Sequence, residues 1–198
     1  MAITTEQIKE LREATGVSVM QCKKALEEAG GDMEKAKIIL RKISKQSAEK
    51  KADRNLGSGV VASYIHGEGG IGAMVELLCE TDFVARNDEF KAIARDIAMH
   101  VAAQAPEYVK IEDVPEEAKT KAKELFAEEI ENNSKDKTPE MKDKIITGKL
   151  EAYLKEKVLL EQSFIKNQDV LIKDLVSGAV QKFGEKTEIG RISRFSVK

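Results

Sequence analysis

The sequence predicts an α+β fold, in which an N-terminal three-helix domain precedes a helix-rich core with a small, mainly antiparallel sheet. Apolar residues recur at helical spacing over the first 44 residues and again after residue 87. Two β-rich runs, Val60 to Ile65 and Ala73 to Cys79, flank the glycine-dense turn GEGG at 67–70. Hydrophobic residues make up 41% of the 198-residue chain and charged residues 34%, which suits helices with solvated outer faces.

The N-terminal domain is expected at residues 1–44. Thr4 with Gln7, and Ser18 with Gln21, have the spacing of a capping box, in which a hydroxyl and a side chain three residues later bond free amide groups. Asp32 is expected to cap a third helix. Glycines separate the three predicted helices: Gly16, Gly30 and Gly31.

A linker and a larger domain follow. Residues 45–57 (KQSAEKKADRNLG) carry many charges and few apolar groups, so we expect a linker that is helical for part of its length. The α+β core is expected at 58–198. Its predicted elements after the hairpin are a helix opened by Asn87 or Asp88, helices from Pro115 and Pro139, an extended segment at 158–165, a helix at 170–183 and a strand at 190–197.

Composition excludes several functional classes. Aromatic residues make up only 5%, there is no Trp and the net charge is -2, so we expect no direct nucleic-acid binding. The phosphate-binding pattern GxxxxGK[ST] does not occur, so no nucleotide binding is expected. No apolar run reaches membrane-spanning length, and we expect a cytoplasmic protein with reduced thiols. The spacing of cysteines and histidines matches no metal site, and no cofactor is expected.

The first informative motif is LREATGVSVMQCKKALEEAGGDMEKA, at residues 11–36. Val19 and Met20 open its second predicted helix, and two interpretations remain open. They are either core residues, as Val and Met usually are, or an exposed pair that docks on a partner. The motif resembles the N-terminal domain of the elongation factor Ts family. That domain is itself similar to ubiquitin-associated domains, and the resemblance implies contact with the nucleotide domain of elongation factor Tu.

The second motif is ELLCETDFVARNDEF, at residues 76–90, where a predicted strand ends ahead of a helix. Asp82 could cap local amides and Phe83 could staple the turn onto the core. The heptapeptide TDFVARN, however, resembles the signature loop of the elongation factor Ts family. This resemblance implies that Thr81, Asp82, Phe83 and Val84 contact elongation factor Tu. Phe83 would insert near the magnesium and phosphate site of that GTPase.

The resemblance covers essentially the whole chain and includes four further segments: HGEGGIGAMVEL (66–77), IAMHVAAQAPEYV (97–109), VLLEQSFIK (158–166) and RISRF (191–195). It implies a guanine nucleotide exchange factor that promotes GDP release from elongation factor Tu and is not an enzyme. His66 matches a family position that lies toward the β-barrel part of the GTPase, although polar residues are common at turns in any case. The chain has Ser163 where the family commonly has proline, between Gln162 and Phe164.

The chain resembles the short form of the family, because it lacks the second core half and the C-terminal extension of longer members. The short form works as a homodimer, so residues 58–198 are expected to include the dimerisation surface. A small sheet with a free edge also favours pairing with a second copy.

The residues also allow two other functions. An enzyme could use Cys79 as nucleophile with His66 or His100 as its base, but an apolar strand makes a buried, inert thiol the favoured interpretation. An RNA-binding or ubiquitin-like adaptor could use the N-terminal module and the basic linker residues Lys45, Lys50, Lys51 and Arg54. Acidic residues interrupt that basic run, which favours a solvated face.

Overall fold

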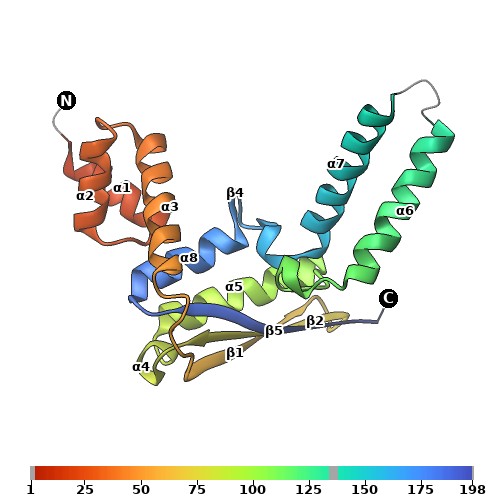
Figure 1. The fold of residues 1–198 in the computed structure, drawn as a ribbon. Coiled ribbons are helices and arrows are strands. Elements are labelled where there is room, and N and C mark those ends of the chain that lie inside the picture. The colour runs from red at the N-terminus through yellow and green to blue at the C-terminus, as the bar shows by residue number, and fades with distance from the viewer. Residues whose placement is uncertain (1–2, 134–137, 198) are drawn as a thin grey trace.

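The computed structural model describes residues 3–133 and 138–197, and its N-terminal part is a three-helix module (Figure 1). The helices are α1 (Thr5–Thr15), α2 (Val19–Glu28) and α3 (Met33–Glu49). Thr4, Ser18 and Asp32 are their N-caps, as predicted. Thr4 and Gln7 form the predicted capping box, whereas the Ser18 hydroxyl donates to the Gln21 side chain, so the second box is only half formed. The module has its own core: Leu11, Val17, Cys22, Ala25, Leu26, Ala36 and Leu40.

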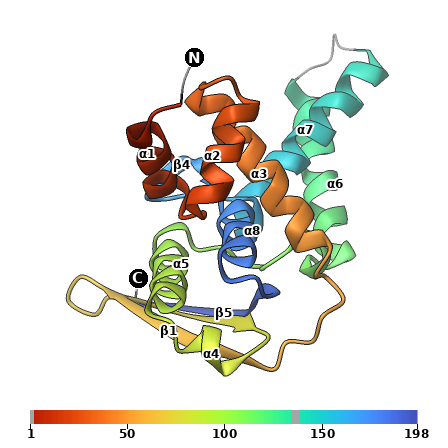
Figure 2. The ribbon, with the colours of Figure 1, turned by 90° about the vertical axis from the view of Figure 1, so that its left-hand side faces the viewer.

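Helix α3 connects this module to the rest of the chain. It continues five residues beyond the boundary expected at residue 44, so the first part of the predicted linker is helical. Its C-terminal half packs against α8 (Ile172–Phe183), where Ser44 donates a hydrogen bond to Gln181. Figure 2 shows α3 running past the side of α8. The α3–α8 helix pair is therefore a contact between the module and the core.

The core is built on a three-stranded antiparallel sheet with the order β1-β2-β5. Strands β1 (Ser58–His66) and β2 (Ile71–Cys79) form the predicted hairpin, and β5 (Thr187–Ser196) pairs with β2. Helix α5 (Asp88–Gln104), capped by Asn87 as predicted, packs across one face together with α8 (Figures 1 and 2). The large, fully buried side chains between these helices and the sheet include Val75, Leu77, Phe90, Ile97, Val101, Leu159 and Ile172.

The opposite face of this sheet is open. No helix or strand of residues 3–133 and 138–197 covers it (Figures 1 and 2). Alternate residues point away from the core, and several are large and exposed: Val61, Ile65, Met74, Phe195 and Val197. We call these five residues the open sheet face.

A helical hairpin projects from the core, formed by α6 (Glu116–Asn133) and α7 (Pro139–Lys157) (Figure 1). The 3₁₀ turn η1 (Ile111–Asp113) precedes it. Salt bridges Lys142–Glu131 and Lys149–Glu129 join the two helices, and the rings of Phe126 and Tyr153 meet edge to face. Both helices begin where the sequence predicts, at or just after a proline.

The segment after this hairpin differs from the prediction. Residues 158–165 were expected to be extended, but η2 (Leu159–Glu161) is a 3₁₀ turn and only β3 (Ser163–Phe164) is a strand. The chain turns here because Val158 and Leu159 are both fully buried, and the Leu159 N–H donates to the Tyr108 carbonyl. Strand β4 (Asn167–Leu171), which pairs with β3, was not predicted. Because β4 takes up these residues, α8 begins at Ile172 and not at 170.

No helix within residues 3–133 and 138–197 combines the length and the apolar character that crossing a membrane requires.

Candidate partner-binding site

The turn after β2 presents the second motif of the sequence. Helix α4 is a single turn (Asp82–Ala85), and its N-cap is Thr81, whose hydroxyl accepts a hydrogen bond from the Val84 N–H at 3.5 Å. The interpretation of Asp82 as the cap of this turn is therefore wrong. Its carboxylate is exposed and pairs with Arg86 at 3.0 Å.

Phe83 lies on the outside of this turn. Its side chain is 83% exposed, so the interpretation of Phe83 as a staple on the core is wrong. The ring borders a shallow hollow that it shares with Asp82, Arg86 and Asn87. A large apolar ring with charged neighbours and no cover is typical of the anchor of a protein interface.

Val84 is predicted to contact the partner together with Phe83, but its side chain points into the core. Its side chain is only 5% exposed and belongs to the main core, next to buried Ala85. Because α4 is helical, adjacent side chains lie about 100° apart, and burying Val84 turns Phe83 outward. The prediction of a direct contact therefore needs correction: Val84 anchors the turn from inside.

Two carboxylates tie the turn to the segment between α8 and β5. Glu185 accepts hydrogen bonds from the Thr81 N–H at 3.0 Å and the Thr81 hydroxyl at 2.6 Å. Glu80 accepts from the Lys186 N–H at 2.5 Å and from Arg54 at 3.1 Å. The Lys186 N–H, followed by the Arg54 guanidinium, holds the pKa of Glu80 below its ordinary value. Sequence reasoning missed Glu185, because nothing local connects it to a residue 104 positions earlier.

Val19 and Met20 form a second exposed apolar position. At the start of α2 they are 49% and 76% exposed, so the interpretation that both are core residues is wrong. Cys22, two residues later on the same helix, is fully buried and faces the module's core. The start of α2 thus presents two apolar side chains to solvent on a rigid, capped helix.

His66 ends β1 at the hairpin turn. It is exposed, and its Nδ1 lies 3.2 Å from the Tyr64 hydroxyl. Because β2 runs from this turn to Cys79, His66 and Thr81 lie at opposite ends of the hairpin, about 25–30 Å apart at the usual rise per residue. The predicted site residues therefore occupy three separate positions on the molecule: the α4 turn, the start of α2 and the tip of the β1–β2 hairpin.

The residues considered for catalysis do not come together. Cys79 is fully buried, its thiol donates to the Thr81 carbonyl, and burial raises its pKa, with the nearby Glu185 carboxylate adding to the effect. His100 is also buried: its Nδ1 accepts from the Ile165 N–H and its Nε2 donates to Gln162. Burial lowers the pKa of His100. Each group is thus satisfied by other partners, and no described histidine faces the thiol.

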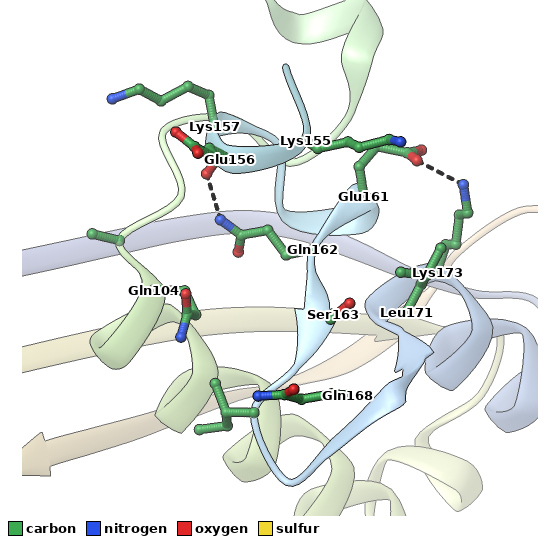
Figure 3. A pocket seen from close by; sticks show the side chains of 12 residues that line it. Gln104, Lys155, Glu156, Lys157, Glu161, Gln162, Ser163, Gln168, Leu171 and Lys173 are labelled. Carbon is green, nitrogen blue, oxygen red and sulfur yellow. Dashed lines mark hydrogen bonds and ion pairs between the residues drawn. The ribbon is translucent and has the colours of Figure 1, made fainter. Parts of the chain in front are cut away.

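A broad hollow lies at the base of the helical hairpin, between α7, η2 and the β3–β4 hairpin (Figure 3). Its charged groups are largely engaged within the chain. Lys173 pairs with Glu161 at 2.7 Å, Lys157 pairs with Glu107, and the Gln162 amide donates to the Glu156 carbonyl at 2.6 Å. The described part of the chain also contains no group of acidic, histidine or cysteine side chains that could hold a metal ion.

The basic linker residues considered for an adaptor are partly engaged as well. Arg54 pairs with Glu80, and Lys51 donates to the Ser47 hydroxyl at 2.8 Å. The neighbouring Lys186 ammonium bonds the Ala52 carbonyl and closes the linker onto the core. These contacts pair charges of the linker and hold the linker against the core, so fewer basic groups remain free to bind nucleic acid.

Comparison with known proteins identifies similar sequences over the full length. The model of the family described as "Elongation factor TS" matches residues 2–198. The chain is 50% identical over 197 residues to an elongation factor Ts of Thermodesulfovibrio yellowstonii, with 100% of this chain and 97% of the relative covered. It is 51% identical to that of Carboxydothermus hydrogenoformans (98% and 89% covered) and 46% identical to that of Coprothermobacter proteolyticus (100% and 99% covered).

Proposed function

The chain belongs to the elongation factor Ts family, and we propose that the exposed ring of Phe83 is its principal contact with elongation factor Tu. As a member of this family it is a guanine nucleotide exchange factor: it binds elongation factor Tu and promotes GDP release, so that GTP can rebind. In the proposal it acts by binding alone, in the cytoplasm, with no catalytic residue of its own.

The observation that carries the proposal is the exposure of Phe83. Its ring is 83% exposed although the adjacent Val84 is buried and the turn is hydrogen-bonded on both sides. Free monomers gain nothing from holding an aromatic ring in water, whereas aromatic anchors dominate the energy of many protein interfaces. Asp82, beside the ring, is exposed and offers a carboxylate to the same partner.

Exchange requires that the chain bind nucleotide-free elongation factor Tu more tightly than the GDP-bound form. A ligand shifts an equilibrium only by its differential affinity for the two states, and the effect is reciprocal. We propose that Phe83 and Asp82 occupy space that the magnesium and phosphate site needs when GDP is bound. Val19 and Met20 would hold the nucleotide domain, and His66 would face the β-barrel part, so that three separated contacts support one docked orientation.

The test is release of a fluorescent GDP analogue from elongation factor Tu, followed by stopped flow with increasing amounts of the chain. The expected result is a release rate that rises with concentration and saturates. If release at saturating concentration equals the spontaneous rate, the proposed function is wrong.

We further propose that the chain is a homodimer joined through the open sheet face. Five large apolar side chains are exposed on this side of the sheet, and the Glu76–Arg191 ion pair on the same side is bidentate at 3.1 Å for both bonds and already neutral. Gly190 makes room for this pair, because a side chain there would meet the Glu76 carboxylate. A second copy of the same face would therefore bury apolar surface without leaving an unpaired charge, which suits a two-fold interface.

Light scattering at micromolar concentration tests this part of the proposal. A dimer mass is expected. A monomer mass would refute the homodimer and would leave the exchange activity to be judged by its own assay.

A further inference from the structure

Glu185 makes an unusual long-range contact with the turn that carries Phe83. Both oxygens of its carboxylate are used: Oε2 accepts from the Thr81 N–H at 3.0 Å and Oε1 accepts from the Thr81 hydroxyl at 2.6 Å. The second distance is typical of a charge-assisted O–H···O⁻ bond. Two bonds from one planar carboxylate fix the orientation of Thr81 as well as its position.

The Thr81 hydroxyl transmits this orientation to α4. A hydroxyl has one hydrogen to donate, and Glu185 receives it, so the oxygen lone pairs are left to face the Val84 N–H, from which they accept at 3.5 Å. Helix α4 has only four residues, and a helix of this length does not form without external support. Its support comes from Thr81 on one side and from buried Val84 and Ala85 on the other.

Phe83 depends on this support more than its neighbours do. Its exposed ring has little packing to hold it, so its direction is determined by the backbone of α4. A second carboxylate strengthens the same junction from the opposite side, since Glu80 at the end of β2 accepts from the Lys186 N–H. The two acidic residues therefore bind reciprocally across the junction, each to the backbone of the other segment.

We infer that Glu185 is a positioning residue for Phe83, holding Thr81 and α4 in the orientation in which the ring enters the partner. The inference rests on the proposed function, because it assigns to Glu185 a role in that same contact. Glu185 itself need not touch elongation factor Tu. Its effect is to order the turn before docking, which removes part of the entropy cost of binding.

The test compares GDP release by the full chain and its variants Glu185→Ala, Glu185→Gln and Phe83→Ala, together with the double variant. Glu185→Ala is expected to lower kcat/KM for exchange about tenfold, mainly through KM, as expected for the loss of charge-assisted hydrogen bonds that organise a binding turn. Glu185→Gln keeps one acceptor oxygen, so its kcat/KM for exchange should lie between the value for Glu185→Ala and the value for the unmodified chain. Glu151→Gln, an exposed glutamate on α7 far from the turn, serves as the matched control and should exchange normally.

The decisive measurement is the effect of Glu185→Ala in the Phe83→Ala background. If Glu185 acts through the ring, the second substitution should change kcat/KM less than about twofold once the ring is gone. A merely structural residue would instead lower exchange by the same factor in both backgrounds, and that outcome overturns the inference. Normal exchange by both Glu185 variants also overturns it. Normal exchange by Phe83→Ala alone would refute the proposed contact itself, so the two failures are distinguishable.

Discussion

Replacing Phe83 with alanine removes a ring that contacts mostly solvent in the free chain and, in our proposal, contacts elongation factor Tu in the complex. Because the ring contributes little to the core, the free energy of unfolding should change by less than about 0.5 kcal/mol, as for other exposed substitutions. The same change made in a buried phenylalanine would cost about 3–5 kcal/mol. Stability and exchange should therefore respond very differently to one substitution.

The expected loss of exchange follows from the exposed area. A phenylalanine side chain offers roughly 200 Å², and 83% exposure leaves about 170 Å² for a partner to bury. At about 25 cal/mol per Å², full burial is worth about 4 kcal/mol as an upper bound. Aromatic anchors at interfaces typically contribute roughly 2–4 kcal/mol. If all of this acts on the transition state for exchange, the rate should fall about 30- to 1000-fold.

Thermal unfolding and stopped-flow GDP release should be measured on the same protein samples. Leu125→Ala is the matched control, since Leu125 is an exposed apolar residue on α6, far from the turn. It should retain both the melting temperature and the exchange rate. A Phe83→Ala variant that melts normally and still exchanges GDP at the normal rate would contradict the proposed contact, whereas a large loss of stability would contradict the exposed position of the ring.

Three further outcomes are expected. Met20→Ala should slow exchange less than Phe83→Ala, and the two effects should add in free energy because the sites are separate, which a double variant in the same assay checks. Phe195→Asp should convert the dimer to a monomer in light scattering while the chain stays folded by circular dichroism, since the side chain is 70% exposed on the open sheet face of the single chain. Burial lowers the pKa of His100, so its contribution to stability is complete above the unfolded pKa of about 6.5 and is lost as the pH falls from there toward the folded pKa. Melting temperatures between pH 7.5 and pH 5 should fall more steeply for the unmodified chain than for His100→Gln.

The parts of the fold that the sequence predicts well are those with local signals. Asp32 and Asn87 cap helices because their side chains reach amide groups two or three residues ahead, whatever the rest of the chain does. The glycine-dense turn at 67–70 allows positive φ angles at Gly67 and Gly69, and this fixes the hairpin locally. These elements needed no knowledge of tertiary contacts.

Residues 158–162 differ from the predicted extended segment, and the strand Asn167–Leu171 is not predicted, because their conformation is determined by distant groups. Val158 and Leu159 turn inward onto the chain near Tyr108, and Gln162 turns toward His100 on α5. A run such as VLLEQSFI carries the same apolar content whether it is a buried 3₁₀ turn or a strand, so periodicity could not separate the two structures.

The candidate site shows the same limit. Apolar residues at positions 83 and 84 are compatible with a staple on the core and with an interface. Only the packing of Val84 into the core decides which of the two side chains points outward. The family resemblance implied contacts by Thr81, Asp82, Phe83 and Val84, and of these Val84 is buried. Glu185 lies outside every local motif, and its role becomes visible only when β2 and the start of β5 are side by side.

Phe83 and its positioning residue Glu185 should act on different parts of the exchange cycle. In our proposal the ring first contacts the surface of elongation factor Tu in the GDP-bound and nucleotide-free forms alike, and ordering the turn lowers the cost of this first contact, so it changes affinity without changing the difference between the two states. In the same proposal, later insertion of the Phe83 ring competes with the bound nucleotide and generates that difference. Loss of Glu185 should therefore raise the concentration of chain that gives half-maximal release and leave the maximal rate nearly unchanged. Loss of the ring should lower the maximal rate itself. Titrations carried to saturation separate the two effects, and a Glu185 variant that lowered only the maximal rate would contradict this division of roles.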